Sequence, residues 1–159
     1  MVYRVLIIGL FLIFFSCDRE KDTPLNEFTI NSADFEGFSF ESFKVVKYPG
    51  FQTPDFFVLV QIETHGELKG PFLSHPDMEA RFFLAGEFDD LESAEAFYSS
   101  YLPEDEKSLQ QFALNVSPNQ VWLIKTNSGS YGKILILKTK SGQIDDKPFA
   151  EIVFKAEIL

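Results

Sequence analysis

The chain has 159 residues and carries 14 Lys and Arg against 24 Asp and Glu, a formal net charge of −10. An acidic surface repels phosphate backbones, so this balance argues against nucleic acid as a partner. The sequence holds a single cysteine, which excludes an intrachain disulfide, and its length suits one ordinary domain.

An apolar stretch lies near the N-terminus. Residues 5–15 are apolar or glycine, Arg4 precedes them, and the charged run DREKD follows at 18–22. A membrane-spanning helix needs roughly 20 apolar residues, whereas the core of a secretory signal needs about 7–15. Residues 1–16 are therefore predicted to be a removable signal peptide. The alternative is a buried N-terminal strand or helix.

The four residues FFSC, 14–17, indicate the type of signal. Phe14 and Phe15 stand where ordinary secretory cleavage favours small residues. The segment resembles a bacterial lipoprotein signal, in which a small residue precedes an acylated cysteine. Ser16 and Cys17 fit that pattern, and Phe14 stands where Leu is usual. The resemblance implies lipid attachment at Cys17 and anchoring to a membrane of the cell envelope.

After the signal, residues 17–26 are charged and broken by Pro24, which predicts a flexible tether. Residues 27–159 are predicted to form one β-rich domain. Residues 72–79 are expected to be loop, and connections are expected at 127–130 and 141–148. The expected strands are 28–30, 35–48 with a bend at Gly37, 56–64, 80–88, 121–126, 131–139 and 149–159.

One helix is predicted, at about residues 89–102. Asp89 and Glu92 have the spacing of a capping box, and apolar residues from Leu91 to Tyr101 then recur at helical spacing. Pro103 ends the pattern. The expected fold class is therefore mainly β: an antiparallel, sandwich-like single domain with one short helix.

Phenylalanine is unusually frequent, with 19 residues in the chain. Aromatic side chains favour strands and bury large areas. The first interpretation is a Phe-rich β core. The alternative is that some of these rings line a pocket for a flat apolar ligand.

No catalytic motif is visible, and the chain is predicted not to be an enzyme. A serine triad assembled in space is the alternative. The two histidines lack the spacing of a metalloprotease site, and no metal site is predicted. The acidic residues at 87–95 complement the expected helix N-terminus and lack the spacing of a calcium loop.

A longer motif lies at residues 116–137, VSPNQVWLIKTNSGSYGKILIL, followed by the strand AEIVFKAEI. It resembles the C-terminal β meander of the HmuY-type haem-binding lipoproteins of Bacteroidota. The resemblance implies an all-β fold, export and lipid anchoring to the outer membrane, with the domain facing the periplasm or the cell surface. If it extends to function, it also implies haem binding, and that family's axial ligands lie outside the matched stretch. The matching positions are Val116, Pro118, Lys125, Thr126, Gly129, Tyr131 and Lys133.

A haem site in this chain would take its axial ligands from His65, His75 and Met78. The intervening GELKGPFLS contains two glycines and a proline, which predicts a loop that folds back. Phe72, Phe82 and Phe83 would offer an apolar wall. The alternative is that both histidines are exposed loop residues and Met78 packs.

The expected function is that of a non-enzymatic binding module, held to the membrane by its lipid anchor, for haem or another planar apolar ligand. The alternative is a structural or accessory lipoprotein that binds an envelope protein. An exposed aromatic patch or a basic partner would favour this alternative.

Overall fold

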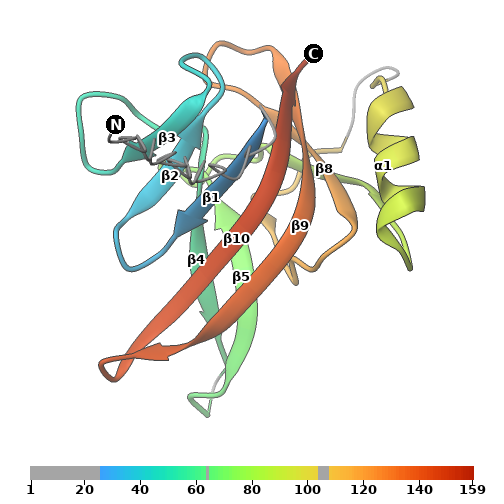
Figure 1. Ribbon diagram of the computed structural model, residues 1–159. Helices are drawn as coiled ribbons and strands as arrows, with labels where there is room; N and C mark the ends of the chain where they lie inside the picture. The colour runs from blue at the N-terminus through green and yellow to red at the C-terminus, as the bar shows by residue number, and fades with distance from the viewer. Residues whose placement is uncertain (1–25, 64, 104–107) are drawn as a thin grey trace, which may run out of the picture.

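The computed structural model describes residues 26–63, 65–103 and 108–159. The predicted signal peptide, Cys17 and the tether up to residue 25 lie outside the described residues. Two antiparallel five-stranded sheets and one short helix make up the described part (Figure 1), so the predicted fold class is confirmed. Within these ranges, no helix has the length and apolar character that a membrane crossing requires.

The first sheet is built mainly from the C-terminal third of the chain. Its strand order is β1-β10-β9-β8-β6, with every neighbouring pair antiparallel. Its strands are β1 (Glu27–Asn31), β6 (Phe82–Glu87), β8 (Gln120–Lys125), β9 (Tyr131–Ile144) and β10 (Lys147–Ile158).

The second sheet comes from the middle of the chain and has the order β3-β2-β4-β5-β7. Residues 72–74, expected to be loop, belong to β5, because they pair with the strongly apolar β4. The strands of this sheet are β2 (Glu36–Ser39), β3 (Lys44–Lys47), β4 (Phe56–Ile62), β5 (Leu68–Ser74) and β7 (Phe112–Ala113).

The hairpin of β9 and β10 extends beyond the sheet's other strands and crosses in front of β4 and β5 in the view of Figure 1. The connection expected at 141–148 is wrong, since both strands continue through it. Asp145 and Asp146 form the turn, and both have positive φ, 50° and 60°. Asp tolerates this backbone region, which two-residue hairpin turns require. The turn at 127–130 is as predicted, with Gly129 at φ 86°.

The core between the sheets is aromatic. Phe38, Phe56 and Phe154 are fully buried, and the Phe154 ring contacts both others at centroid distances of 5.3 and 5.4 Å. Phe28 from β1 lies 5.8 Å from Phe154. The interpretation of these phenylalanines as core is confirmed.

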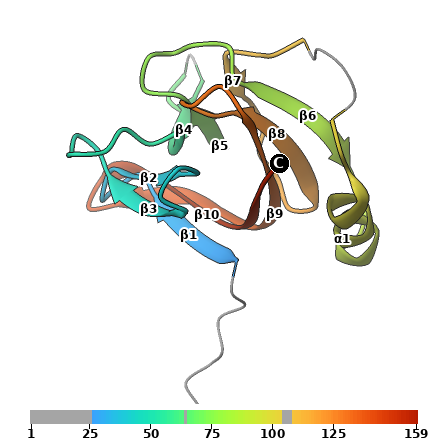
Figure 2. The ribbon, with the colours of Figure 1, turned by 90° about the horizontal axis from the view of Figure 1, so that it is seen from above.

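The helix α1 (Leu91–Ser100) covers the outer face of the first sheet, as Figure 2 shows from above. Ala94 and Tyr98 pack there on Val121 and Leu135. The sheet's central strand is therefore covered on both faces, which explains the consecutive apolar residues at 134–137. Burial raises the pKa of the Tyr98 phenol, and the nearby Glu157 carboxylate adds to the shift.

The helix cap lies one residue later than predicted. Asp90, not Asp89, is the N-cap, and its carboxylate accepts hydrogen bonds from the backbone N–H of Ser93 at 2.8 Å and from its hydroxyl at 3.0 Å. These bonds hold the pKa of Asp90 below its usual range. Lys133, which belongs to the matched motif, is buried beneath the helix and donates to the carbonyl of Tyr101 at 3.2 Å.

Candidate functional site

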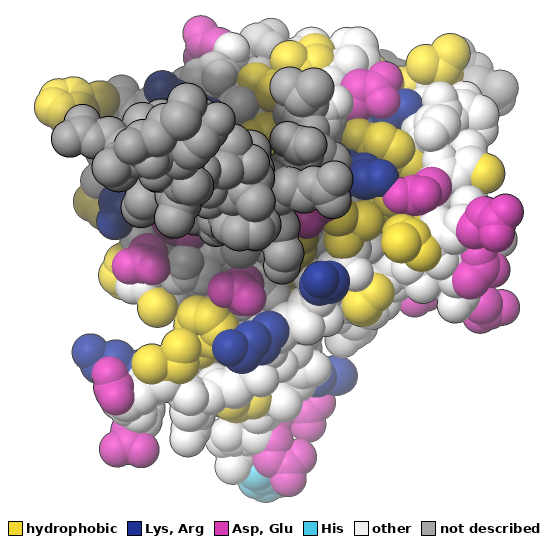
Figure 3. Space-filling view, in the orientation of Figure 1, with side chains coloured by type: hydrophobic (Ala, Val, Ile, Leu, Met, Phe, Trp, Pro, Cys, Tyr) yellow, Lys and Arg dark blue, Asp and Glu magenta, His cyan; other side chains and the backbone are white. Residues whose placement is uncertain are grey.

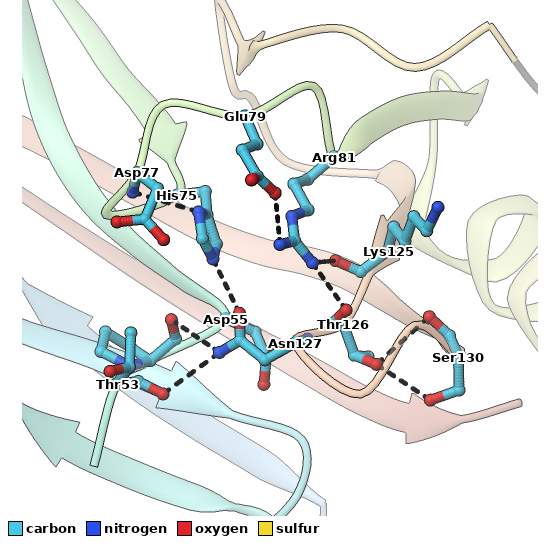
Figure 4. Close-up of polar contacts among 11 residues, drawn as sticks. Thr53, Asp55, His75, Asp77, Glu79, Arg81, Lys125, Thr126, Asn127 and Ser130 are labelled. Atoms are coloured by element: carbon cyan, nitrogen blue, oxygen red, sulfur yellow. Dashed lines mark hydrogen bonds and ion pairs between the residues drawn. The ribbon is translucent and has the colours of Figure 1, made fainter.

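His75, a predicted haem ligand, follows β5 and is completely buried (Figure 4). Its Nδ1 accepts the backbone N–H of Asp77 at 3.1 Å, and its Nε2 lies 2.8 Å from Oδ1 of Asn127. Since Nδ1 accepts, Nε2 carries the proton and donates to Asn127. Both ring nitrogens are therefore engaged inside the protein.

Asn127 lies in the turn between β8 and β9 of the first sheet. From there the network continues to the segment just before β4 of the second sheet (Figure 4). The side-chain amide of Asn127 donates to the carbonyls of Thr53 and Pro54, each at 3.3 Å. The carboxylate of Asp55, 2% exposed, accepts the backbone N–H of Asn127 with one oxygen. Its other oxygen accepts the N–H of Phe40 at 2.6 Å. These contacts tie the β8–β9 turn to the end of β5 and the start of β4, so His75 has a structural role here.

The other two predicted ligands lie elsewhere. His65 is exposed in the turn between β4 and β5, and the segment expected to fold back is the extended strand β5. That expectation is wrong: seven strand residues at about 3.3 Å each hold His65 and His75 roughly 20 Å apart. Met78 shares a turn with His75, but its side chain is 61% exposed.

The predicted apolar wall is divided as well. Phe82 is fully buried in the first sheet, whereas Phe72 belongs to the second. His65, His75 and Met78 therefore do not converge on one site in this structure.

A different feature stands out, a groove around Phe35, in the turn between β1 and β2. Three adjoining cavities of about 360, 300 and 210 Å³ share Ser32 and Phe35 in their lining. Figure 3 shows the surface hollowed, with hydrophobic side chains on its borders. This Phe35 groove is lined by Ser32, Ala33, Phe35, Glu36, Tyr48, Phe57, Val58, Leu59, Val60, Phe72, Ile144, Asp145, Lys147, Pro148 and Phe149.

Several aromatic rings at this groove face solvent. Phe35 is 67% exposed, at φ 51°, and Tyr48 is 37% exposed. The rings of Tyr48 and Phe57 are stacked 6.2 Å apart with an interplanar angle of 6°. Outside the groove, Phe51 is fully exposed in the loop that follows Tyr48 and lines a separate pocket. Large aromatic side chains that are exposed to solvent on neighbouring loops are typical of an interaction surface.

The residues of this groove were missed in the sequence. The available signal was the position of Phe35 within a turn, where polar residues are usual. The aromatic count alone did not separate Phe35 from the core phenylalanines, because all of them occur within or beside strand-like patterns.

The border of the groove is acidic. Glu36 and Asp145 are among its lining residues, and Asp34 and Asp146 stand next to lining residues in the two turns. Lys147 also lines the groove and Lys47 stands next to Tyr48, so four carboxylates stand against two ammonium groups. The field at the groove therefore favours a partner that carries positive charge.

Among the described residues, no group of three or more His, Cys, Asp or Glu side chains is arranged to hold a metal ion. No family model, curated protein or solved structure matches the chain. The candidate site therefore rests on the geometry of the Phe35 groove.

Proposed function

We propose that the chain is a lipid-anchored envelope protein whose folded domain binds a protein partner through the Phe35 groove, without catalysing a reaction. The observation that carries the proposal is the exposure of Phe35 and Tyr48 at one apolar groove. Anchoring rests on the lipoprotein-like sequence that ends at Cys17.

Of the two functions expected from the sequence, the exposed aromatic patch favours the protein-binding one. Aromatic side chains supply much of the binding energy at protein interfaces, where they fill desolvated pockets. The acidic border adds a preference for a basic partner. The haem alternative has less support, because His75 is engaged with Asp77 and Asn127 and lies far from His65.

Cys17→Ala is expected to abolish acylation, because the chain has no other thiol to accept the lipid. Labelling of cells with radioactive palmitate measures this directly, with Ser16→Ala as the control that retains a small residue before the cysteine. Equal labelling of the Cys17→Ala variant and the wild type would contradict the anchor assignment.

Photocrosslinking in the native cells tests the partner assignment. A photoreactive phenylalanine analogue at position 35, which lies in the groove and is exposed, is expected to capture one discrete protein. The same analogue at Ala96, exposed on α1, is the matched control and is expected to capture none of that protein. The proposal fails if the two positions give the same products, or if position 35 gives none.

Hemin is expected to produce no saturable Soret shift with the full-length chain in lipid nanodiscs, because its predicted axial ligands do not converge. Absorbance titration against empty nanodiscs makes the measurement. A saturable shift that is lost in His65→Ala would restore the haem hypothesis. His65 is the suitable position because it is exposed, so its replacement leaves the buried network of His75 intact.

A further inference from the structure

Strand β4 is paired on both sides only at its start. β5 pairs along its length, whereas β2 pairs with Phe56 and Phe57 alone. From Val58 to Ile62 the second edge of β4 has no strand partner in the described part of the chain. Leu59 and Val60, on this stretch, line the Phe35 groove.

The backbone of Val60 points toward this open edge. Val60 lies opposite Pro71 on β5, and Pro71 has no N–H to donate. The carbonyl of Pro71 accepts the N–H of Val116, beyond the far edge of β5. The two residues thus form a non-hydrogen-bonded pair, in which each backbone directs its polar groups away from the other. The N–H and C=O of Val60 therefore face outward, into the groove.

Nearby edges carry the features that block strand pairing. Lys44 and Lys47 stand at both ends of the edge strand β3. Pro148 lies on β10 just beyond its pairing with β1 and has no N–H to offer. The open stretch of β4, VLVQI, contains neither a charge nor a proline. It retains the backbone groups and the apolar side chains that a further strand requires.

We infer that the open edge of β4 binds an extended segment of the partner protein as an additional β-strand. This inference rests on the proposed function and specifies how the groove is used. The outward backbone of Val60 would hydrogen-bond the segment, and Phe35 and Leu59 would contact its alternating apolar side chains. The acidic residues Asp34, Glu36 and Asp145 complement Lys or Arg at the ends of such a segment.

A single extended segment fits the surroundings better than a second folded copy. The edge lies within a groove bordered by Phe35 on one side and by Pro148 on the hairpin of β9 and β10. A folded domain would have to bring its whole sheet into this groove, whereas a peptide enters alone. A copy of this chain would also add its own acidic charge.

The test uses the full-length chain in lipid nanodiscs and a displayed library of nine-residue peptides. The peptides carry Val, Ile, Leu or Phe at every second position and Lys or Arg at both ends. The best binder is then resynthesised with one N-methyl group at each position in turn. N-methylation at every second residue is expected to weaken binding about tenfold, while the intervening positions change it little, because only alternate amides face β4.

Val60→Pro provides the test from the protein side. Proline at this position removes an N–H that points away from β5, so no bond of the β4–β5 ladder is lost. The variant is expected to keep its thermal transition and to lose peptide binding at least tenfold. Val60→Thr, which keeps the N–H, is the matched control and is expected to bind like the wild type.

The outcomes separate this inference from the proposed function. Strand addition is overturned if a peptide binds without a period-two N-methyl pattern, or if no peptide binds with a dissociation constant below about 1 mM. This deliberately weak limit corresponds to a binding free energy of roughly −4 kcal/mol. The photocrosslinking result would in that case still support the proposed protein partner. Self-association of the chain that Val60→Pro abolishes would show a second copy as the occupant and overturn the inference. If Val60→Pro unfolds, the N-methyl scan alone decides.

Discussion

Phe154→Ala is expected to lower the free energy of unfolding by about 3–5 kcal/mol. The side chain is fully buried in β10, and its ring contacts the rings of Phe28, Phe38 and Phe56 from three other strands. Truncation would leave a cavity between the two sheets where aromatic contacts now join them. The loss is a large share of the 5–15 kcal/mol typical of a whole domain.

Denaturant melts of Phe154→Ala and Phe51→Ala measure this effect. Phe51 is fully exposed, so its truncation serves as the matched control and is expected to change the unfolding free energy by less than about 0.5 kcal/mol. A cost below about 1 kcal/mol at Phe154 would contradict the assignment of this face of β10 to the core.

Asp55→Ala is expected to lower the free energy of unfolding by about 2–4 kcal/mol, since it leaves the N–H groups of Phe40 and Asn127 without an acceptor. The same change would release the β8–β9 turn that also holds His75. Asp34→Ala, which removes an exposed carboxylate in the β1–β2 turn, is the control and is expected to cost under 1 kcal/mol. Equal costs for the two variants would show that the buried network contributes little.

The fold class was predictable because periodicity reports which residues are buried. The apolar residues at 134–137 indicated a strand covered on both faces, and the structure covers it with the core on one side and α1 on the other. The hairpin at 127–130 was predictable from Gly129, whose positive φ suits glycine. The continuation of β9 to Ile144 was not, because Ser141, Gly142 and Gln143 resemble a loop in composition.

The site was less predictable, because it depends on contacts between distant segments. His75 and Asn127 are 52 positions apart in the sequence, and nothing local shows that the imidazole is engaged. The open edge of β4 is likewise a property of strand pairing. The sequence offers Pro71 and an apolar strand, but it does not show that β2 ends its pairing at Phe57.

The most direct measurement is amide hydrogen exchange at Leu59, Val60 and Gln61 in the full-length chain, with and without the captured partner. In the free chain the amides of Leu59 and Gln61, which face β5, are expected to exchange slowly and that of Val60 quickly. With the partner bound, Val60 is expected to become as slow as its neighbours. A slow Val60 amide in the free chain, or a fast one in the complex, would contradict the assignment of this edge as the binding site.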